Sequence, residues 1–423
     1  MILENYNMGA YNLHFIKTNK FKTISVEIDF RRLEKKEDTT IRNLLKMALI
    51  DSNFEYKNQR DLIIATENLY DIKISSILSR LGNYSNLSFR TKFLNEKYTE
   101  DNMNEESIRF LLDLIFKPNI DNNSFVEIDK IKNKLKKSIV LTRDNKLKYA
   151  ILKLFETTKN MPYSYNTMGN VDDLKNIDGK MLYEYYNKVI NEDLIDIYVV
   201  GNFDTKGMKD IFKNYFNVKT FKKQNNNFIV KELIPRKRIV KYKEYDDVNQ
   251  TQVTLLCSLH ALSEYERNYV IKVYSHILGG SSNSVLFQNI REKNSYAYYV
   301  NSDVKAYDNI MIIYSGIEKE NIEKVLKLMK IALLKMEKGD FSNDDMNAAV
   351  LTMVNSVEAS LDSPFGMISQ AMSQALINPD DINTKIKKYQ NIKKEEIIAV
   401  AKKVKLHTVL TLEQGGSDEE DKS

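Results

Sequence analysis

The sequence predicts an α+β protein of two duplicated domains, each an antiparallel-rich β-sheet covered by helices. Strand patterns recur at a spacing of roughly 210–230 residues, from 24–30 to 251–257 and from 194–200 to 408–412, and a repeat this long is a duplicated domain rather than a solenoid unit. Segments with apolar residues at helical spacing separate the strands. The length of 423 residues is too great for one ordinary core and agrees with two domains.

The first half opens on a strand at 24–30. Ile24, Val26, Ile28 and Phe30 alternate with polar residues, so we expect one buried and one solvated face. The other expected elements of this half are a helix at 38–49, a strand pair within 70–97, a helix at 104–117, helices within 124–160 with a break near Asp144, a helix at 181–190 and a strand at 194–203.

The second half repeats this order. A strand at 251–257 is followed by a helix whose start carries a capping box, Ser263 with Glu266. Gly279 is expected to end this helix in a left-handed conformation. The remaining expected elements are a strand pair at 297–304 and 309–317, a helix at 322–338 ended by Gly339, three further helices and a final strand at 408–412.

Domain boundaries follow from composition. We expect an N-terminal domain at 1–217, a linker at 218–238 that is polar and asparagine-rich, and a C-terminal domain at 239–413. The acidic tail, 414–423, has nothing to bury and is expected to be disordered.

The charge pattern argues against a nucleic-acid partner. The net charge is only +5 against 63 basic and 58 acidic residues, and the two signs are interspersed, as in 317–330. The most basic stretch, Lys130–Lys137, contains no aromatic residues and is typical of a solvated helix face.

The sequence also predicts neither a membrane partner nor a secreted protein. No apolar run approaches the roughly 18 residues of a membrane span, and the first residues do not resemble a signal peptide. The single cysteine, Cys257, excludes a disulfide within the chain and favours a reducing compartment. We therefore expect a cytoplasmic protein.

Histidine is too scarce and too scattered to predict a metal site. No two of the four, His14, His260, His276 and His407, lie within the three to five residues that place both on one helix face. A long-range site from His260 and His276 stays open but has no supporting spacing. No phosphate-binding loop or nucleophile elbow occurs, so no cofactor is predicted.

The most distinctive segment is 278–300, LGGSSNSVLFQNIREKNSYAYYV. It resembles a run in the second half of the insulinase/pitrilysin family of zinc peptidases, in the bacterial branch that is similar to the mitochondrial processing peptidase. In that family an arginine and, seven residues on, a tyrosine bind substrate; the matching residues are Arg291 and Tyr298. Residues 181–204 also resemble the family, and the resemblance extends from residue 1 to about 413.

The chain departs from that family at the zinc site. The family's H-x-x-E-H helix would correspond to the helix at 40–51, which places the three motif positions on Leu44, Met47 and Ala48. Leucine and alanine do not bind zinc, and methionine cannot take a proton from water. The stretch 131–143, where the resemblance places the third ligand, has no carboxylate. We therefore predict no catalytic residue and no metal site in this chain.

Two interpretations of Arg291 and Tyr298 follow. From the residues alone, Arg291 pairs with Glu292 or caps its helix, and Tyr298 packs on its strand. The resemblance instead implies that the pair grips a substrate carbonyl or carboxylate.

The resemblance also implies a partner. In two-subunit members of the family one chain binds zinc and the other supplies the arginine and tyrosine, and an extended peptide adds to a sheet edge. This chain would then be the non-catalytic subunit beside a zinc-bearing homologue with an H-x-x-E-H motif, acting on a peptide or protein substrate. A narrower resemblance is to a bacterial pair associated with aminopentanol modification of elongation factor P.

Two other functions remain open. One is a purely structural subunit, which the core subunits of respiratory complex III resemble. The other is a protein that binds a peptide or a modified factor without any proteolysis.

Overall fold

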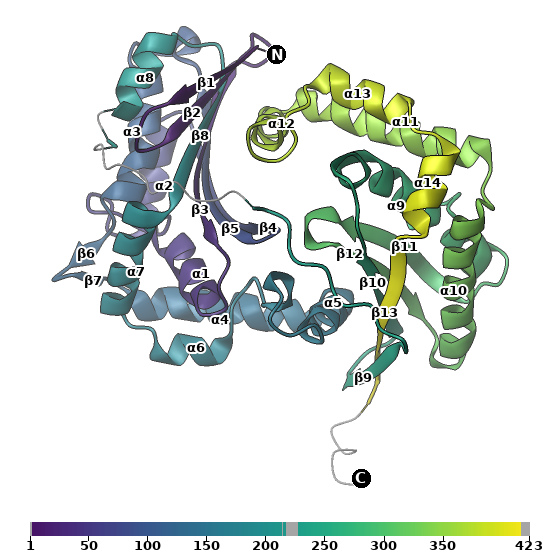
Figure 1. The fold of residues 1–423 in the computed structure, drawn as a ribbon. Coiled ribbons are helices and arrows are strands. Elements are labelled where there is room, and N and C mark those ends of the chain that lie inside the picture. The colour runs from purple at the N-terminus through teal and green to yellow at the C-terminus, as the bar shows by residue number, and fades with distance from the viewer. Residues whose placement is uncertain (1, 214, 217–226, 416–423) are drawn as a thin grey trace. The chain divides into compact units, whose positions relative to one another are not determined.

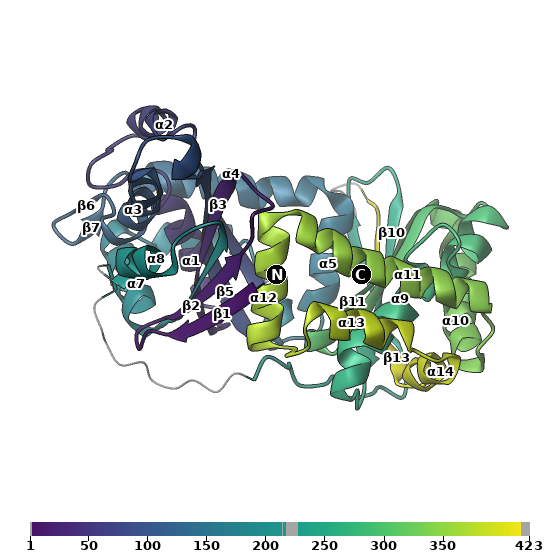
Figure 2. The same ribbon diagram turned by 90° about the horizontal axis from the view of Figure 1, so that it is seen from above.

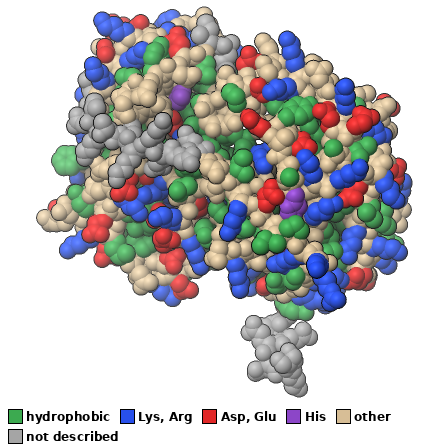
Figure 3. Space-filling model, in the orientation of Figure 1, with side chains coloured by type: hydrophobic (Ala, Val, Ile, Leu, Met, Phe, Trp, Pro, Cys, Tyr) green, Lys and Arg blue, Asp and Glu red, His purple; other side chains and the backbone are tan. Residues whose placement is uncertain are grey.

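The computed structural model describes residues 2–213, 215–216 and 227–415. The expected linker, 218–238, lies outside the described residues as far as 226, and the expected acidic tail lies outside them from 416 on. No helix in the described ranges is both long and apolar enough to cross a membrane. Basic and acidic side chains are interspersed over the face shown in Figure 3.

The chain forms two compact units, neither of which is contiguous in sequence. The first unit consists of Met1–Val140, Tyr165–Phe228 and Ala359–Pro379, and the second of Leu141–Ser164, Ile229–Glu358 and Asp380–Ser423. Each unit therefore contains one segment from the opposite half of the chain, in contrast to the continuous domains expected at 1–217 and 239–413.

A six-stranded mixed sheet organises the first unit (Figure 1). Its order is β1-β2-β8-β3-β5-β4, and all neighbours are antiparallel except β2 and β8. The strands are β1 Ile2–Asn7, β2 Asn12–Lys17, β3 Thr23–Leu33, β4 Lys73–Leu81, β5 Tyr84–Leu94 and β8 Leu194–Gly201. The expected strands at 24–30 and 194–203 and the expected pair within 70–97 are confirmed.

Helices cover one face of this sheet and bury it in a continuous apolar core. They are α1 Asp38–Ala48, α2 Gln59–Asn68, α3 Met103–Phe116, α4 Ile128–Asp144, α6 Val171–Asn176, α7 Gly179–Glu192 and α8 Thr205–Lys213. Two short strands, β6 Ile120–Asp121 and β7 Ser124–Phe125, pair as a separate hairpin. The expected helices at 38–49, 104–117 and 181–190 are confirmed.

The expectation of a half-solvated β3 is wrong. Its apolar residues lie in the core, but Glu27, Asp29 and Arg31 on the other face are also almost fully buried. Part of the cover is α12 Pro364–Leu376, a helix distant in sequence that packs on β2, β8 and β3 (Figure 2). Arg31 lies instead over the rings of Tyr84 and Phe228. Alternation in a single strand carries no information about such a distant cover.

A five-stranded sheet organises the second unit, in the order β11-β12-β10-β13-β9, with only β13 and β9 parallel. The strands are β9 Val240–Asp246, β10 Thr251–Leu259, β11 Ala297–Lys305, β12 Ile310–Ile317 and β13 Val404–Gln414; the helices are α5 Lys146–Glu156, α9 Ile271–Gly279, α10 Ile322–Lys338, α11 Asn343–Ala359, α13 Ile382–Gln390 and α14 Lys394–Ala401. Four helices, α11 to α14, lie between α10 and the final strand, rather than the three expected.

The helix after β10 begins as expected but ends differently. The Ser263 amide donates to Glu266 and the Glu266 amide to the Ser263 hydroxyl, so the capping box forms. The first turn, Glu266–Val270, is π-helical. Gly279 is the last helical residue and its φ is not positive; Gly280, the residue after it, has a φ of −94°. A Cβ on Gly279 would lie 2.6 Å from the Ser302 backbone nitrogen, so its role is to let α9 approach β11 closely.

Each half of the chain gives one segment to the other unit, 141–164 to the second and 359–379 to the first, and the two segments contain equivalent helices. α5 follows α4 in the first half and packs on β10 and β13 of the second unit, where Ala150 and Leu154 are fully buried. α12 follows α11 in the second half and buries Ile368 and Ala371 against the first unit's sheet. Each sheet is thus covered on its second face by a helix from the other half of the chain.

Candidate substrate-binding site

The three positions that the resemblance assigns to the zinc motif lie on α1. Leu44 and Ala48 are 0% and 6% exposed and belong to the apolar core, and Met47 packs against it, half-buried. Their side chains provide neither a zinc ligand nor a base. Among the described residues, no group of three or more histidine, cysteine, aspartate and glutamate side chains could hold a metal ion.

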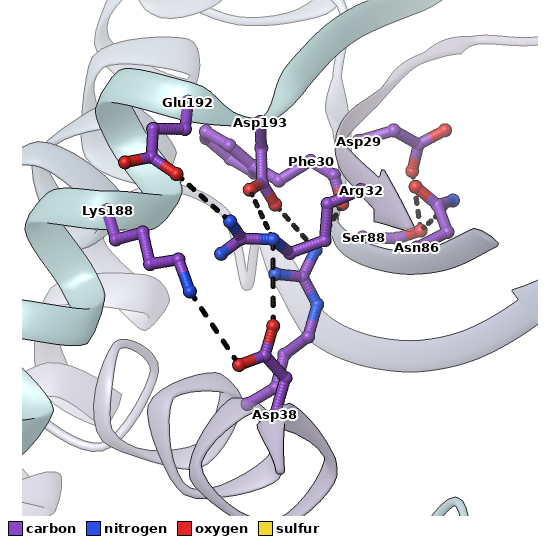
Figure 4. A network of polar contacts seen from close by, with 10 residues as sticks. Asp29, Phe30, Arg32, Asp38, Asn86, Ser88, Lys188, Glu192 and Asp193 are labelled. Carbon is purple, nitrogen blue, oxygen red and sulfur yellow. Dashed lines mark hydrogen bonds and ion pairs between the residues drawn. The ribbon is translucent and has the colours of Figure 1, made fainter. Parts of the chain in front are cut away.

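Buried ion pairs hold α1 in place (Figure 4). The Arg42 guanidinium donates to the Phe30 carbonyl at 2.6 Å and to Asp193 at 2.7 Å, and Arg32 lies 3.4 Å from the same carboxylate. Burial raises the pKa of Asp193, and the two arginines oppose that shift. These contacts join α1, β3 and the residue after α7, so they are structural.

A second group of buried acids lies under α12. Ser88 donates to Asp29, and Arg90 donates to Glu27 at 2.9 Å. Burial is the main reason that the pKa values of Asp29 and Glu27 are raised, and it favours their neutral forms. Because Glu27 and Asp29 are almost fully buried, they are inaccessible to a substrate.

The four histidines occupy separate structural positions. His14 contacts Asn5 and Asp196, and His260 contacts Ser258 and Glu232. Burial lowers the pKa of His407 to about 4. His276 lines a pocket of about 300 Å³ with neighbours that include Asp344 and Asp345. His260 is not among that pocket's lining residues, so a His260–His276 site has no support.

Arg291 is exposed on a π-helical turn, Phe287–Glu292, that packs against β11. Its guanidinium lies over the Phe287 ring, 4.8 Å from the ring centroid. It forms no ion pair with any residue that the structure describes, including Glu292. Stacking on a ring fixes the guanidinium while leaving its donors available.

Tyr298 lies on β11, an edge strand of the second unit's sheet. Ala297 pairs with Ile317 and Tyr299 with Gly316, so Tyr298 is the extra residue of a β-bulge. Its side chain is 55% exposed, and its hydroxyl donates to Glu318 at 2.9 Å. That bond is the main reason that the pKa of Tyr298 is raised.

Arg291 and Tyr298 therefore lie on adjoining elements of one unit, both exposed, with no hydrogen bond between them. Within the described residues Arg291 does not pair with Glu292, and Tyr298 is hydrogen-bonded to Glu318 across its hairpin. Sequence reasoning missed Glu318. The only signal was the expected strand pair at 297–304 and 309–317, whose hairpin register brings the residue after the second strand back to the start of the first.

Comparison with known proteins gives consistent matches. A family model described as "Peptidase M16 inactive domain" matches residues 176–353. A Bacillus subtilis (strain 168) protein, "Probable inactive metalloprotease YmfF", is 29% identical over 416 residues, with 96% of each chain covered. A second protein of that strain, "Uncharacterized zinc protease YmxG", is 24% identical over 305 residues, which cover 70% of this chain and 72% of that protein.

The fold also matches a crystal structure. A conserved protein from Enterococcus faecalis V583 superposes with a TM-score of 0.92 at 23% identity, covering 99% of this chain and 100% of that one. At this level of identity the match concerns the fold.

Proposed function

Because the chain belongs to the M16, insulinase-like family of peptidases as an inactive member, we propose that it is the non-catalytic subunit of a two-chain peptidase. In this proposal a zinc-bearing homologue with an H-x-x-E-H motif carries out the cleavage. The present chain binds an extended peptide or protein substrate and positions it through Arg291 and Tyr298.

One contrast supports this proposal most directly. The helix positions that would bind zinc are filled by side chains of the apolar core, whereas Arg291 and Tyr298 remain exposed on an edge strand and the turn before it. An exposed arginine can donate to a carbonyl or carboxylate, and the oxygen of an exposed tyrosine can hydrogen-bond to a peptide.

The occurrence of two kinds of relative in one strain supports a pairing. One Bacillus subtilis relative is described as an inactive metalloprotease and the other as a zinc protease. The proposed complex requires this composition, namely one chain without zinc ligands and one zinc-bearing homologue.

The sheet edges are suited to an extended peptide. β11 is an edge strand, and β4 at the edge of the other sheet pairs with β5 over nine residues without a bulge. Between Lys73 and Arg80, β4 has no charged residue. Unprotected edges of this kind are where extended peptides add as a further strand.

We also propose that the complex acts in the cytoplasm. Cys257, the only cysteine, is buried as a free thiol, and burial raises its pKa to about 12. The chain thus has no intramolecular disulfide that would require an oxidising compartment.

Co-expression with the H-x-x-E-H homologue from the same genome tests the proposal. We expect the two chains to co-purify and to cleave peptides that neither chain cleaves alone. Arg291→Ala and Tyr298→Phe are expected to lower kcat/KM, for Arg291→Ala by roughly tenfold or more, because a hydrogen bond to a charged group contributes about 1.5–3 kcal/mol.

Two matched variants control for general effects. Lys293→Ala removes a neighbouring exposed positive charge, and Tyr242→Phe removes an exposed phenol on β9. Both are expected to retain wild-type activity. A complex whose activity is unchanged by Arg291→Ala and Tyr298→Phe would instead support the structural-subunit function. A chain that binds peptides but neither co-purifies with the homologue nor supports cleavage would support the binding-protein function.

A further inference from the structure

The hydroxyl group of Tyr298 already uses its one hydrogen in a hydrogen bond. A tyrosine hydroxyl has one hydrogen to donate, and here it donates to Glu318, the residue directly after β12. What the oxygen can still offer to a ligand is a lone pair. In this arrangement Tyr298 accepts hydrogen bonds, so it is suited to an N–H group rather than to a carbonyl oxygen.

Glu318 itself has no cation beside it. The two nearest lysines in sequence are directed elsewhere. The Lys319 ammonium lies 3.7 Å from Glu413, and that of Lys324 donates to Asn321 and lies 5.0 Å from the centroid of the Tyr296 ring. Within the described part of the chain, no basic side chain pairs with Glu318, which is exposed.

Arg291 does not supply the missing charge either. Its guanidinium lies over Phe287, and it makes no ion pair with Glu318. One unit of the protein thus presents an open cation at Arg291 and an open anion at Glu318, on neighbouring elements. A ligand that satisfies both must carry an oxygen acceptor at one point and a positively charged nitrogen at another.

We propose that Glu318 makes the site selective for peptides with a basic group, either a lysine or arginine side chain or an N-terminal ammonium. The basic group contacts the Glu318 carboxylate and the Tyr298 oxygen, while a backbone carbonyl or a carboxylate of the same peptide contacts Arg291. This inference rests on the proposed function, because it assumes that Arg291 and Tyr298 bind peptide. Glu318 is then a specificity-determining residue.

Selection from a random mixture tests the inference. The full chain is immobilised and incubated with biotinylated random octapeptides, and the recovered peptides are sequenced by mass spectrometry. We expect lysine and arginine to be enriched about two- to fivefold over the input, since an exposed ion pair contributes up to about 1 kcal/mol. In Glu318→Lys this enrichment is expected to disappear and acidic residues to be favoured.

Glu320→Lys is the matched control. Glu320 is exposed two residues away, and the substitution makes the same change in net charge. It is expected to recover the same peptides as the wild type. Equal enrichment in wild type and Glu318→Lys would overturn the inference, as would loss of enrichment in Glu320→Lys, because the preference would then reflect net charge.

The experiment separates this inference from the proposed function. If Arg291→Ala recovers as much peptide as the wild type, the proposed substrate site itself is wrong. If Arg291→Ala reduces recovery while Glu318→Lys leaves the peptide composition unchanged, the site stands and only the selectivity for basic groups is rejected.

Discussion

Glu34 shows how burial changes the charge of a single residue in this protein. It follows β3 on the way to α1, and burial raises the pKa of its carboxyl group to about 7, although the nearby Arg80 and Arg42 oppose the shift. A pKa raised in the folded state means that stability is fully present below the unfolded value of about 4.5 and is lost as the pH rises through about 7.

Glu34→Gln is expected to remove this loss of stability at higher pH, because glutamine does not ionise. Near pH 5 the variant and the wild type are expected to unfold at similar temperatures, and at pH 8 the variant is expected to be more stable by roughly 1–3 kcal/mol, since one pKa unit corresponds to about 1.4 kcal/mol. Thermal unfolding between pH 5 and 8 measures the difference. An advantage that stays constant across this range would contradict the assignment to Glu34.

Residues differ in how far the sequence can predict them. The resemblance to a known family was enough to select Arg291 and Tyr298 as candidates and to assign the motif positions to Leu44, Met47 and Ala48 on one helix. The contact between Tyr298 and Glu318 depends on the hairpin register and on a one-residue bulge. A bulge has no dependable sequence signal on a strand as polar as β11.

At the scale of elements, the side of α1 that carries the three positions assigned by the resemblance to a zinc motif is part of the apolar core. Polar groups placed in a packed core cost several kcal/mol when they are unpaired. The helix therefore has a structural role, and introducing the zinc motif alone should not create a metal site.

The triple variant Leu44→His, Met47→Glu and Ala48→His tests this. We expect its free energy of unfolding to fall by roughly 3 kcal/mol or more, and zinc to be bound at well below one equivalent. Denaturant titration and metal analysis measure the two effects. Glutamine at the same three positions is the control without metal ligands, and a zinc-dependent stabilisation of the histidine variant alone would disprove the prediction.

Elements with strong periodicity were predictable and the others were not. Strands β3 and β10 and helices α3, α7 and α10 carry clear apolar patterns. The short or polar elements β1, β9, α2 and α6 lack them, since their burial depends on neighbours supplied by other parts of the chain. For the same reason the buried second face of β3 was invisible in its own sequence.

At the scale of the whole molecule, the duplication was predictable from repeated strand patterns, but the exchange of α5 and α12 was not. A helical pattern of apolar residues predicts that one face will be buried, but it does not predict which sheet will cover that face. As a result, the chain cannot be divided into two independent pieces near residue 217.

A fragment of residues 1–216 is therefore expected to be less stable than the same region in the full chain. It lacks α12, so Ile16, Tyr198 and Val200 lose their apolar cover. A peptide of residues 359–379 is expected to raise its melting temperature, by roughly 2–4 °C for each kcal/mol of stabilisation.

The control peptide carries Ile368→Asp and Ala371→Asp, which place charges on the helix face that is buried against the sheet. It is expected to have no effect. A fragment that is as stable without either peptide would show that α12 is dispensable for the first unit.

The same exchange matters while the chain is being made. The last strand of the first sheet ends at Gly201, and the helix that covers its second face ends at Leu376. The ribosome therefore adds about 175 further residues before α12 can cover the sheet. This takes roughly 10–35 seconds at bacterial to eukaryotic elongation rates. During that interval the apolar surface around Ile16 and Val200 is open to other nascent chains. Molecular chaperones that bind such surfaces are thus expected to engage this protein during translation, and to release it once α12 has emerged.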